Sequence, residues 1–265
     1  MDLQIRQIFI VTYYHLLESK RNYQIILTNL ALPILFFITS LIIENNSHMT
    51  TEELKNLIYL QFFSTSLLFG ILTFSFSMPL QNNVEATEEG KNDMLQKTDL
   101  KQINYIMGDK LADLMLLNFQ ILFVLFLFSS LKTVSDLPVI KICILANLSF
   151  LSINPFAYLI STKIKTVKLA NNIGVLITLI LLFSLTFTKM FSTMTTLDFT
   201  ALNRILTINP MFGFYDCLNN LLLGTKEFYF GSEIKNMLYV LFYVIIVSFF
   251  EVYFSKKKGN WNYGR

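Results

Sequence analysis

The sequence predicts an all-α membrane protein with six transmembrane helices, and two observations support this class. Hydrophobic residues make up 54% of the 265-residue chain and charged residues only 15%, whereas soluble domains carry about 25% charged residues. Six stretches also approach the roughly 20 apolar residues that cross the hydrocarbon core as a helix. These spans form one membrane domain, residues 1–265, and lie at about 24–43, 57–80, 111–131, 138–161, 169–187 and 236–254.

The distribution of Lys and Arg predicts that both termini lie in the cytoplasm. In this orientation the inner segments hold 14 of the 21 basic residues, and the short outer loops with their margins hold only Lys55, Lys132 and Lys141. Cytoplasmic loops of membrane proteins carry such an excess of Lys and Arg. An even number of spans agrees with this orientation, so we expect a multi-pass protein of the cell membrane.

The first 22 residues are too polar and too short to cross a bilayer. Apolar residues such as Ile8 and Phe9 alternate there with polar ones such as Arg6, His15 and Lys20. This mixture favours a helix that lies in the cytoplasmic membrane interface, with a soluble N-terminal arm as the alternative. No cleavable signal is expected, since Arg6 interrupts the first apolar positions.

Few ionisable residues fall inside the predicted spans. Asp113 and Glu251 lie near the inner ends and Lys141 near the outer end, so we expect them to be interfacial or snorkelling side chains. Transporters driven by ion gradients place such groups deep in the bilayer. His15 and His48 are the only histidines, and both lie outside the spans. A gradient-coupled pump, an intramembrane hydrolase and a metal site are therefore disfavoured.

The chain also lacks the features of a nucleotide-binding or nucleic-acid-binding protein. It contains no Gly-x-x-x-x-Gly-Lys-Ser/Thr phosphate loop, and a net charge of +3 is too small to indicate nucleic acid. We therefore expect no cofactor in this chain and no catalysis by the chain itself. Cys143 and Cys217 are predicted to be apolar fillers, although a disulfide between them is not excluded.

Between the second and third spans lies an insert, residues 85–110, in which ten of 26 residues are Asp, Glu or Lys. Leu100, Ile103 and Met107 follow helical spacing. Asp99 stands three residues before Gln102, which is the spacing of a capping box. These patterns predict a helix–turn–helix on the cytoplasmic face rather than a disordered loop, with a solvated amphipathic loop as the alternative.

This insert resembles the corresponding segment in the membrane subunits of ABC-2 type ABC transporters. The matching residues are Glu88-Glu89-Gly90, Leu95, Thr98-Asp99 and Gly108-Asp109-Lys110. Two departures are Asp99, where proline is common, and Asp109, which separates Gly108 from Lys110. The resemblance implies that the insert is a coupling helix seated on a cytoplasmic ATPase subunit. The implied ATPase-coupling residues are Glu88, Glu89, Gly90, Leu95, Thr98, Asp99, Leu100, Gly108 and Lys110.

A second resemblance to the same family lies before the sixth span, in residues 202–224. ABC-2 subunits commonly carry a broken helical hairpin here that re-enters the outer leaflet. Asn209-Pro210 halts a helix and Gly213 permits a sharp turn. The resemblance thus implies an outer re-entrant gate containing Asn209, Pro210, Gly213, Asp216 and Gly224. An ordinary outer amphipathic helix is the alternative.

Together these resemblances imply the permease subunit of an ATP-driven exporter in a bacterial cell membrane. Its expected partners are two copies of a cytoplasmic ABC ATPase that binds ATP and Mg, a second membrane subunit (identical or similar), and membrane lipid. As in the family, the second and fifth spans would line the path. Candidate path residues are Phe62, Ser66, Phe69 and Phe74, although a phenylalanine stripe also suits lipid contact or core packing.

The predicted cargo is amphipathic, and an antimicrobial or cytolytic peptide is the favoured guess. Drugs, lipids and polysaccharide are open alternatives. A membrane scaffold or signalling subunit that docks an ATPase without moving cargo is the rival from another class, and a passive channel is a third.

Overall fold

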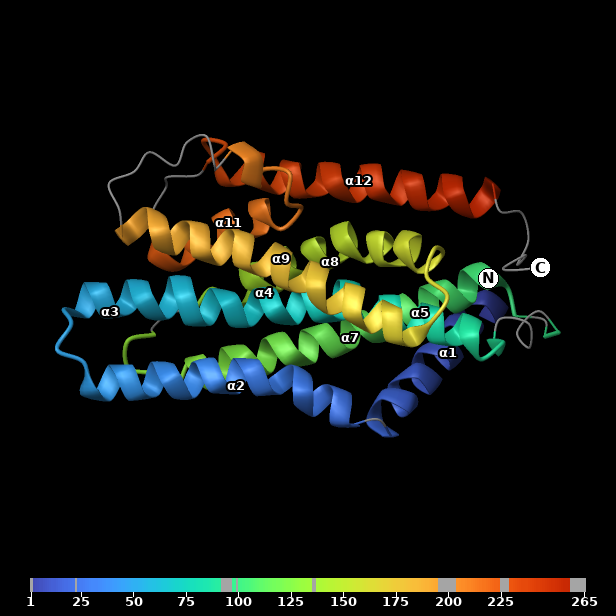
Figure 1. Ribbon diagram of the computed structural model, residues 1–265, viewed down its shortest axis with the longest axis horizontal. Helices are drawn as coiled ribbons and strands as arrows, with labels where there is room; N and C mark the ends of the chain where they lie inside the picture. Colours follow the sequence, from blue (N-terminus) through green and yellow to red (C-terminus); the bar gives the residue numbers. More distant parts are fainter. Residues whose placement is uncertain are drawn as a thin grey trace.

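The computed structural model describes residues 2–21, 23–91, 97–98, 100–134, 137–194, 204–224 and 229–257. All regular structure within these ranges is helical, and no strand occurs in them. The long helices run side by side in an elongated bundle (Figure 1). The predicted all-α class is therefore confirmed.

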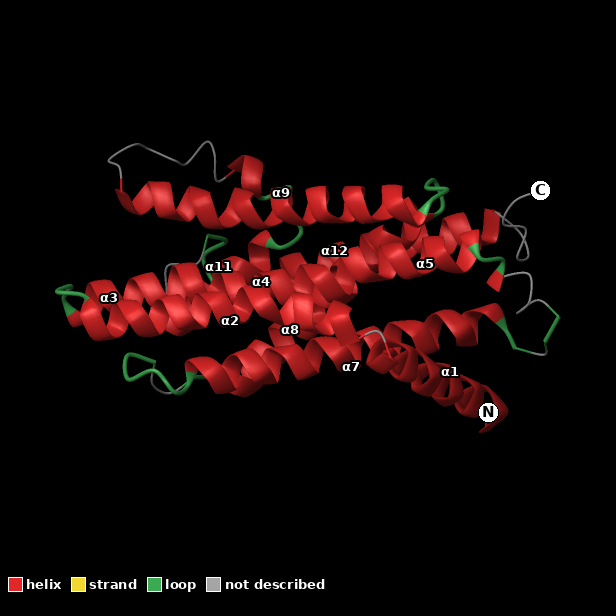
Figure 2. Cartoon of the chain, turned by 60° about the horizontal axis from the view of Figure 1, so that its bottom comes forward, coloured by secondary structure: helices red, strands yellow, loops and turns green. Residues whose placement is uncertain are grey.

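The N-terminal segment forms α1 (Asp2–Arg21), followed by α2 (Tyr23–Asn46). The axis of α1 is inclined to the bundle (Figure 2), and the helix packs against α7. In contrast, α2 lies at the edge of the bundle, and only 11% of its most apolar window is buried in the protein. Exposed side chains such as Leu27 and Leu35 on α2 are therefore available to lipid or to another subunit.

The second span is a single long helix of 38 residues, Thr51–Glu88. A capping box starts it, in which Thr50 Oγ1 accepts from the Glu53 amide and the Glu53 carboxylate accepts from the Thr50 amide. Its parts are α3 (Thr51–Leu57), the π-helical η1 (Ile58–Phe63), α4 (Ser64–Leu72), the π-helical η2 (Thr73–Ser77) and α5 (Met78–Glu88).

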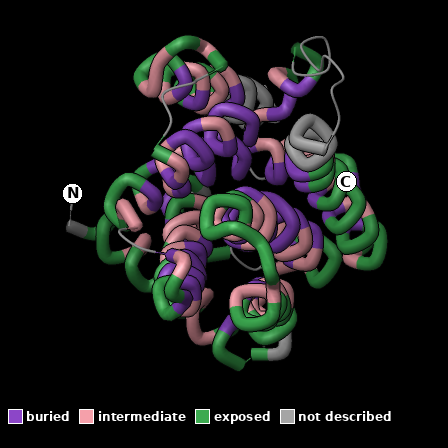
Figure 3. Tube along the Cα trace, turned by 90° about the vertical axis from the view of Figure 1, so that its left-hand side faces the viewer, coloured by how far each residue is buried: buried purple, intermediate pink, exposed green. Residues whose placement is uncertain are grey.

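This helix forms the centre of the bundle, with 78% of its apolar window buried. Its sequence is apolar on all sides, as expected for a helix surrounded by others. Figure 3, which views the bundle from one end, shows that buried segments gather between the helices and exposed ones face outward.

The remaining helices are α7 (Gln102–Phe128), α8 (Val139–Ser161), α9 (Val167–Met194), α11 (Phe212–Leu223) and α12 (Glu233–Lys257). α12 packs along α8, and α9 packs along α4, η2 and α5. The last turns of α12 and the whole of α1 lie at the same end of the bundle (Figure 1). We call this the α1 end.

Five helices in the described residues are long and apolar enough to cross a membrane. They are Ile26–Asn46, Thr51–Glu88, Ile103–Phe128, Val139–Ser161 and Val167–Phe187. The first five predicted spans fall on these helices. The predicted sixth span falls on α12, which is not among the five, and the count of six stays a prediction.

The structure corrects one local prediction in the insert. Leu100, Ile103 and Met107 were expected to belong to a separate short helix, but Ile103 and Met107 lie in the first turns of α7. The predicted capping box of Asp99 and Gln102 cannot be compared in the same way, since Asp99 lies outside the described residues. The residue at the N-cap of α7 is Lys101, without a side-chain hydrogen bond.

Candidate functional site

The first part of the insert is anchored to the body of the protein by short polar contacts. α5 ends at Glu88, and Gly90 adopts a left-handed backbone with φ 69°, a conformation that favours glycine. Glu88 Oε2 accepts a hydrogen bond of 2.7 Å from the amide of Val167, at the start of α9. Glu88 and Gly90 thus fix where the second span ends and how it meets the fifth.

Lys91 links the beginning of the insert to α1. Its Nζ lies 3.1 Å from Glu89 and 3.2 Å from Glu18. Burial lowers the pKa of Lys91, but the hydrogen bonds and charges of Glu89 and Glu18 outweigh this effect and raise it above its usual value. Lys91 therefore stays charged at neutral pH and holds the two carboxylates together.

The second part of the insert lies partly outside the described residues. Of the predicted coupling residues, Leu95 and Asp99 fall outside them. Thr98 Oγ1 accepts from the amide of Leu100 at 3.3 Å, and the Leu100 side chain is half-buried. Gly108 and Lys110 are helical residues of α7.

Gly108 explains how closely α1 approaches α7. A Cβ atom at this position would lie 2.6 Å from Val11 Cβ and 2.9 Å from the carbonyl oxygen of Ile8. Thr12 Oγ1 also donates to the carbonyl oxygen of Gly108 at 3.0 Å. Only glycine allows the two backbones to come this close.

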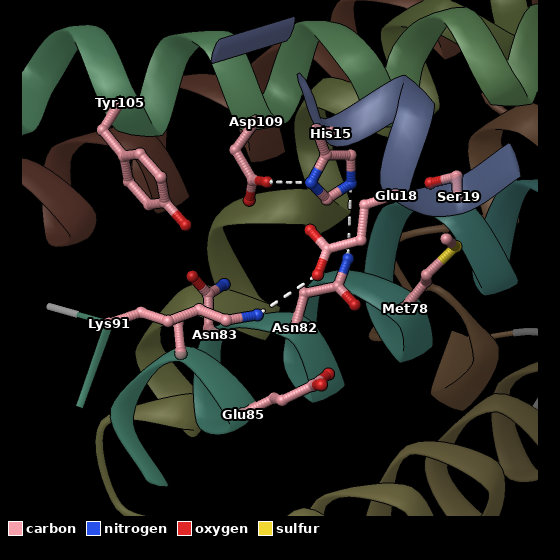
Figure 4. A pocket seen from close by; sticks show the side chains of 11 residues that line it. His15, Glu18, Ser19, Met78, Asn82, Asn83, Glu85, Lys91, Tyr105 and Asp109 are labelled. Carbon is pink, nitrogen blue, oxygen red and sulfur yellow. Dashed lines mark hydrogen bonds and ion pairs between the residues drawn. The ribbon is translucent and has the colours of Figure 1, made fainter. Parts of the chain in front are cut away.

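A buried ionic cluster lies beside this contact (Figure 4). His15 Nδ1 is 2.7 Å from Asp109 Oδ1, and His15 Nε2 is 3.3 Å from Asp113 Oδ1. Asn82 of α5 approaches the same ring, with its Nδ2 3.5 Å from His15 Nε2. Asp113 is 0% exposed, so it is a buried partner of α1 and not the interfacial side chain that its position predicted. We call His15, Asp109 and Asp113 the His15 cluster.

His15 carries a positive charge in this environment. Burial lowers its pKa, but hydrogen bonds to Asp109 and Asp113 and the charges of both carboxylates raise the pKa to about 11. A protonated imidazole carries an N–H on both ring nitrogens. One faces Asp109 at hydrogen-bond distance, and the other forms an ion pair with Asp113, whose buried carboxylate oxygens have no partner of hydrogen-bond geometry. A small pocket of about 90 Å³ lies next to the cluster and is also lined by Glu18, Lys91 and other residues of α1, α5 and α7.

The predicted outer gate residues come together at the opposite end of the bundle. Asn209 Nδ2 donates to the Leu181 carbonyl at 3.0 Å, and its Oδ1 accepts from the Met211 amide at 2.9 Å. Pro210 lies in this turn, which precedes α11. Asn209 thus ties the hairpin to α9.

Asp216 and two glycines organise the hairpin further. The Asp216 carboxylate accepts from the amide of Tyr229 at 2.9 Å and from the side chain of Asn236 on α12. Gly213 is helical and does not form the predicted turn. Instead a Cβ there would lie 2.8 Å from Tyr239 Cδ1, so glycine permits close packing of α11 on α12. Gly224 caps α11 with φ 67°.

The predicted path residues do not share one surface. Ser66 and Phe74 are buried in the protein core, where Ser66 Oγ donates to the carbonyl oxygen of Phe62. The Phe62 ring packs against Phe36 of α2. Phe69 lines a cavity that has a volume of about 480 Å³ and lies between α2, the second span and α9.

Two features of this arrangement were not predicted from the sequence. His15 and its partner Asp109 are 94 residues apart in the chain, and no local pattern marks them as neighbours. The polar lining of the cavity is likewise spread over three helices. Cys143 and Cys217 are free thiols, and the described residues contain no group of three or more His, Cys, Asp or Glu side chains suited to a metal ion.

Comparison with protein families identifies one match. The model of a family described as "ABC-2 family transporter protein" matches residues 7–252, a range that covers most of α1 and α12 and all the helices between them. Comparison with curated proteins found no match.

Proposed function

The chain belongs to the ABC-2 family of transporter proteins, and on this premise we propose that it is the permease subunit of an ATP-driven exporter. Together with the family, its apolar helices indicate a multi-pass membrane protein. Members of this family are membrane components of transporters and normally work with an ABC ATPase and a second membrane subunit. In our proposal two ATPase copies bind ATP and Mg and supply the energy.

The observation that carries the proposal is the anchoring of the insert at the α1 end. Glu88 is bonded to the start of α9, Lys91 is paired with Glu18 of α1, and the last part of the insert is the start of α7, from Gln102. A load applied to residues 85–110 would therefore reach α1, the second span, α7 and α9 together. A surface that transmits force needs such rigid attachment, with a few apolar anchors among charges to fix its register.

Leu95 and Leu100 are the proposed apolar anchors on the ATPase. We propose that Glu88, Glu89, Gly90, Thr98, Asp99, Gly108 and Lys110 shape and hold the element that carries them. Both termini and the insert would then lie in the cytoplasm, in agreement with the excess of Lys and Arg there.

The cargo path is proposed to pass along the cavity that Phe69 lines. Both the second span and α9 border this cavity, and α2 at its edge is the most exposed of the apolar helices. A second membrane subunit placed against this edge would enclose the cavity. The mixture of polar and apolar side chains around it suits an amphipathic cargo, and a peptide is the cargo we favour.

At the other end, the hairpin of Asn209, Pro210, Gly213, Asp216 and Gly224 is proposed to form the outer gate. Its buried polar contacts support a position inside protein, which is where irregular backbone at membrane depth is tolerated. Cysteines introduced at Leu218 and Leu222, which are both buried on α11, should react slowly with impermeant thiol reagents in intact cells. Ready labelling of both would indicate an ordinary exposed helix.

The proposed function is tested by co-purification with an ABC ATPase encoded beside it, followed by ATP hydrolysis in lipid. Leu95→Asp and Leu100→Asp should each reduce ATPase binding, because an acid at an apolar anchor loses its burial. Met49→Asp is the matched control, since Met49 is an exposed apolar residue in the loop at the opposite end. Normal binding and coupling in both insert variants would refute the coupling role. A complex that binds the ATPase but moves no cargo would identify a scaffold instead.

A further inference from the structure

The cavity between α2, the second span and α9 has an unusual lining for a space among apolar helices. Three carboxamides face it, from Asn29, Gln81 and Asn171, together with hydroxyl groups such as those of Thr73 and Thr178. Apolar side chains complete the wall. Its volume of about 480 Å³ lies within the range of sites for small molecules.

The backbone of the second span helps to create this lining. The π-helical segment η2 runs from Thr73 to Ser77, and such widened turns often occur at functional sites. Gly174 on α9 lies against this segment, since a Cβ at Gly174 would come 2.9 Å from Ser77 Oγ. The close approach at Gly174 leaves the neighbouring part of α9, with Thr178, at the cavity wall.

No Asp, Glu, Lys, Arg or His is among the described residues that line the cavity. A phosphate or carboxylate would therefore enter without a cationic partner, and an ammonium group without an anionic one. Burying an unpaired charge costs far more than burying a neutral polar group. The lining thus selects against charged ligand groups.

Two of the polar groups lack a hydrogen-bond partner in the folded chain. Asn29 and Thr178 are 9% and 4% exposed, and neither Asn29 Nδ2 nor Thr178 Oγ1 has a partner. A helical threonine often bonds to the carbonyl oxygen four residues earlier, as Thr186 does with Leu182 on the same helix. Thr178 does not make this bond. Because Thr178 lines the cavity, a ligand bound there could supply the missing partner.

We propose that this cavity binds an uncharged segment of peptide main chain, with Asn29 and Thr178 bonding to its amide groups. This inference rests on the proposed function and names the class of cargo. A peptide amide offers a donor and an acceptor side by side, and carboxamides and hydroxyls can meet both. The hydrocarbon chains of a lipid offer neither, and a phospholipid headgroup brings charge that the lining cannot pair.

Gln81 and Asn171 support the same assignment. They hold each other through a hydrogen bond of 3.1 Å from Gln81 Nε2 to Asn171 Oδ1, across the gap between α5 and α9. This bond does not use the Nδ2 donor of Asn171 or the Oε1 acceptor of Gln81. The two groups match the donor and acceptor of one further amide, and Met78 and Val175, about one helical turn from Gln81 and Asn171, supply apolar lining.

The experiment measures binding to the full-length protein, purified with its ATPase and held in lipid nanodiscs without ATP. The probe is a fluorescent Leu–Ala–Gly peptide with blocked ends and no charge. It should bind saturably, and the same peptide with two Lys residues, or with N-methylated amides, should bind at least tenfold more weakly. A short-chain phosphatidylglycerol should not displace it. Equal binding of the charged or N-methylated peptide, or displacement by the lipid, would overturn the proposal.

Two variants test whether the peptide probe binds in the cavity. Thr178→Val and Asn29→Leu keep the side-chain volume but remove hydrogen-bonding groups, and each should weaken probe binding about fivefold, the effect of one net hydrogen bond. Thr186→Val is the matched control on α9 and should leave the affinity unchanged. If Thr178→Val and Asn29→Leu also leave the affinity unchanged while all variants remain folded and bind the ATPase, the site is refuted.

These outcomes are separate from those that test the proposed function. Failure of the probe to bind in a complex whose ATPase is bound and active would refute the peptide site alone. Failure of the ATPase to associate would refute the exporter, whatever the isolated chain binds.

Discussion

Replacement of His15 by Gln should destabilise the protein strongly, because it leaves two buried carboxylates without their cation. At the observed separations of 2.7 and 3.3 Å, an effective dielectric constant of about 20 gives attractions of about 6 and 5 kcal/mol. Removal of all three groups from water cancels much of this gain. Breaking a buried ion pair by deleting one partner costs about 3–5 kcal/mol, and we expect a loss of this size.

The assay is thermal unfolding in detergent, for which such a loss predicts a fall in midpoint of about 10 °C. His48→Gln is the control, because His48 is exposed and should change the midpoint by less than a degree or so. The double variant His15→Gln/Asp113→Asn should recover much of the loss, since one of the unpaired charges is gone. Equal midpoints for the two single His variants would refute the idea that the His15 cluster holds α1 on α7.

The pH dependence of the unfolding midpoint provides a second test of the His15 cluster. Since the pKa of His15 is raised from 6.5 to about 11 in the folded protein, its stabilising effect is complete below pH 6.5 and declines as the pH rises toward 11. The difference in midpoint between wild type and His15→Gln should thus be largest near pH 6 and smaller at pH 10. Asn82, Glu18 and Lys91 line the pocket next to His15. They are present in both the wild type and the His15→Gln variant. A difference that grows with pH would contradict the charge assignment.

Three further substitutions test packing and polar burial, each by the same thermal assay. Gly108→Ala should cost about 1–3 kcal/mol, because its Cβ would lie 2.6 Å from Val11 Cβ and 2.9 Å from the Ile8 carbonyl oxygen. A Gly108→Ala variant as stable as the wild type would exclude this clash. Gln120→Leu should stabilise the protein by about 1–3 kcal/mol, because neither polar atom of the buried Gln120 amide has a hydrogen-bond partner. A loss of stability would point to an undetected partner. Gly224→Ala should lower the stability by about 1–2 kcal/mol, because Gly224 has a φ of 67°. Gly224→Asn should lower it less, and equal losses would argue against backbone strain at this position.

Hydropathy predicted the membrane helices because burial in a bilayer depends on the composition of each segment alone. The ends of the helices were less predictable. The second span was expected at 57–80 but the helix runs from Thr51 to Glu88, since a capping box at Thr50 starts it in a polar segment. The third was expected from residue 111, but α7 begins at Gln102. Polar residues can continue a helix outside the apolar core, so hydropathy marks the membrane boundary and not the end of the helix.

The candidate sites were predicted unevenly for a similar reason. Gly90 and Gly224 act through local backbone geometry, which a motif can indicate. The His15 cluster depends on the path that α1 takes across α7, and Asp113 therefore looked like a boundary residue. The lining of the cavity depends on η2 and on the approach of α9 at Gly174, neither of which has a clear signal in a single sequence.

The contacts at the α1 end differ in strength, and the difference indicates how a load on the insert would travel. The pair of Lys91 and Glu18 has side chains that are 39% and 64% exposed, and exposed pairs contribute at most about 1 kcal/mol. Glu88 bonds directly to the backbone of α9, but Glu88 is also exposed, so this contact is weak as well. The His15 cluster between α1 and α7 is buried, and breaking it costs more than breaking either exposed contact. We therefore infer that α1 and α7 move as one body, whereas the insert is joined to α9 and to α1 by weaker contacts.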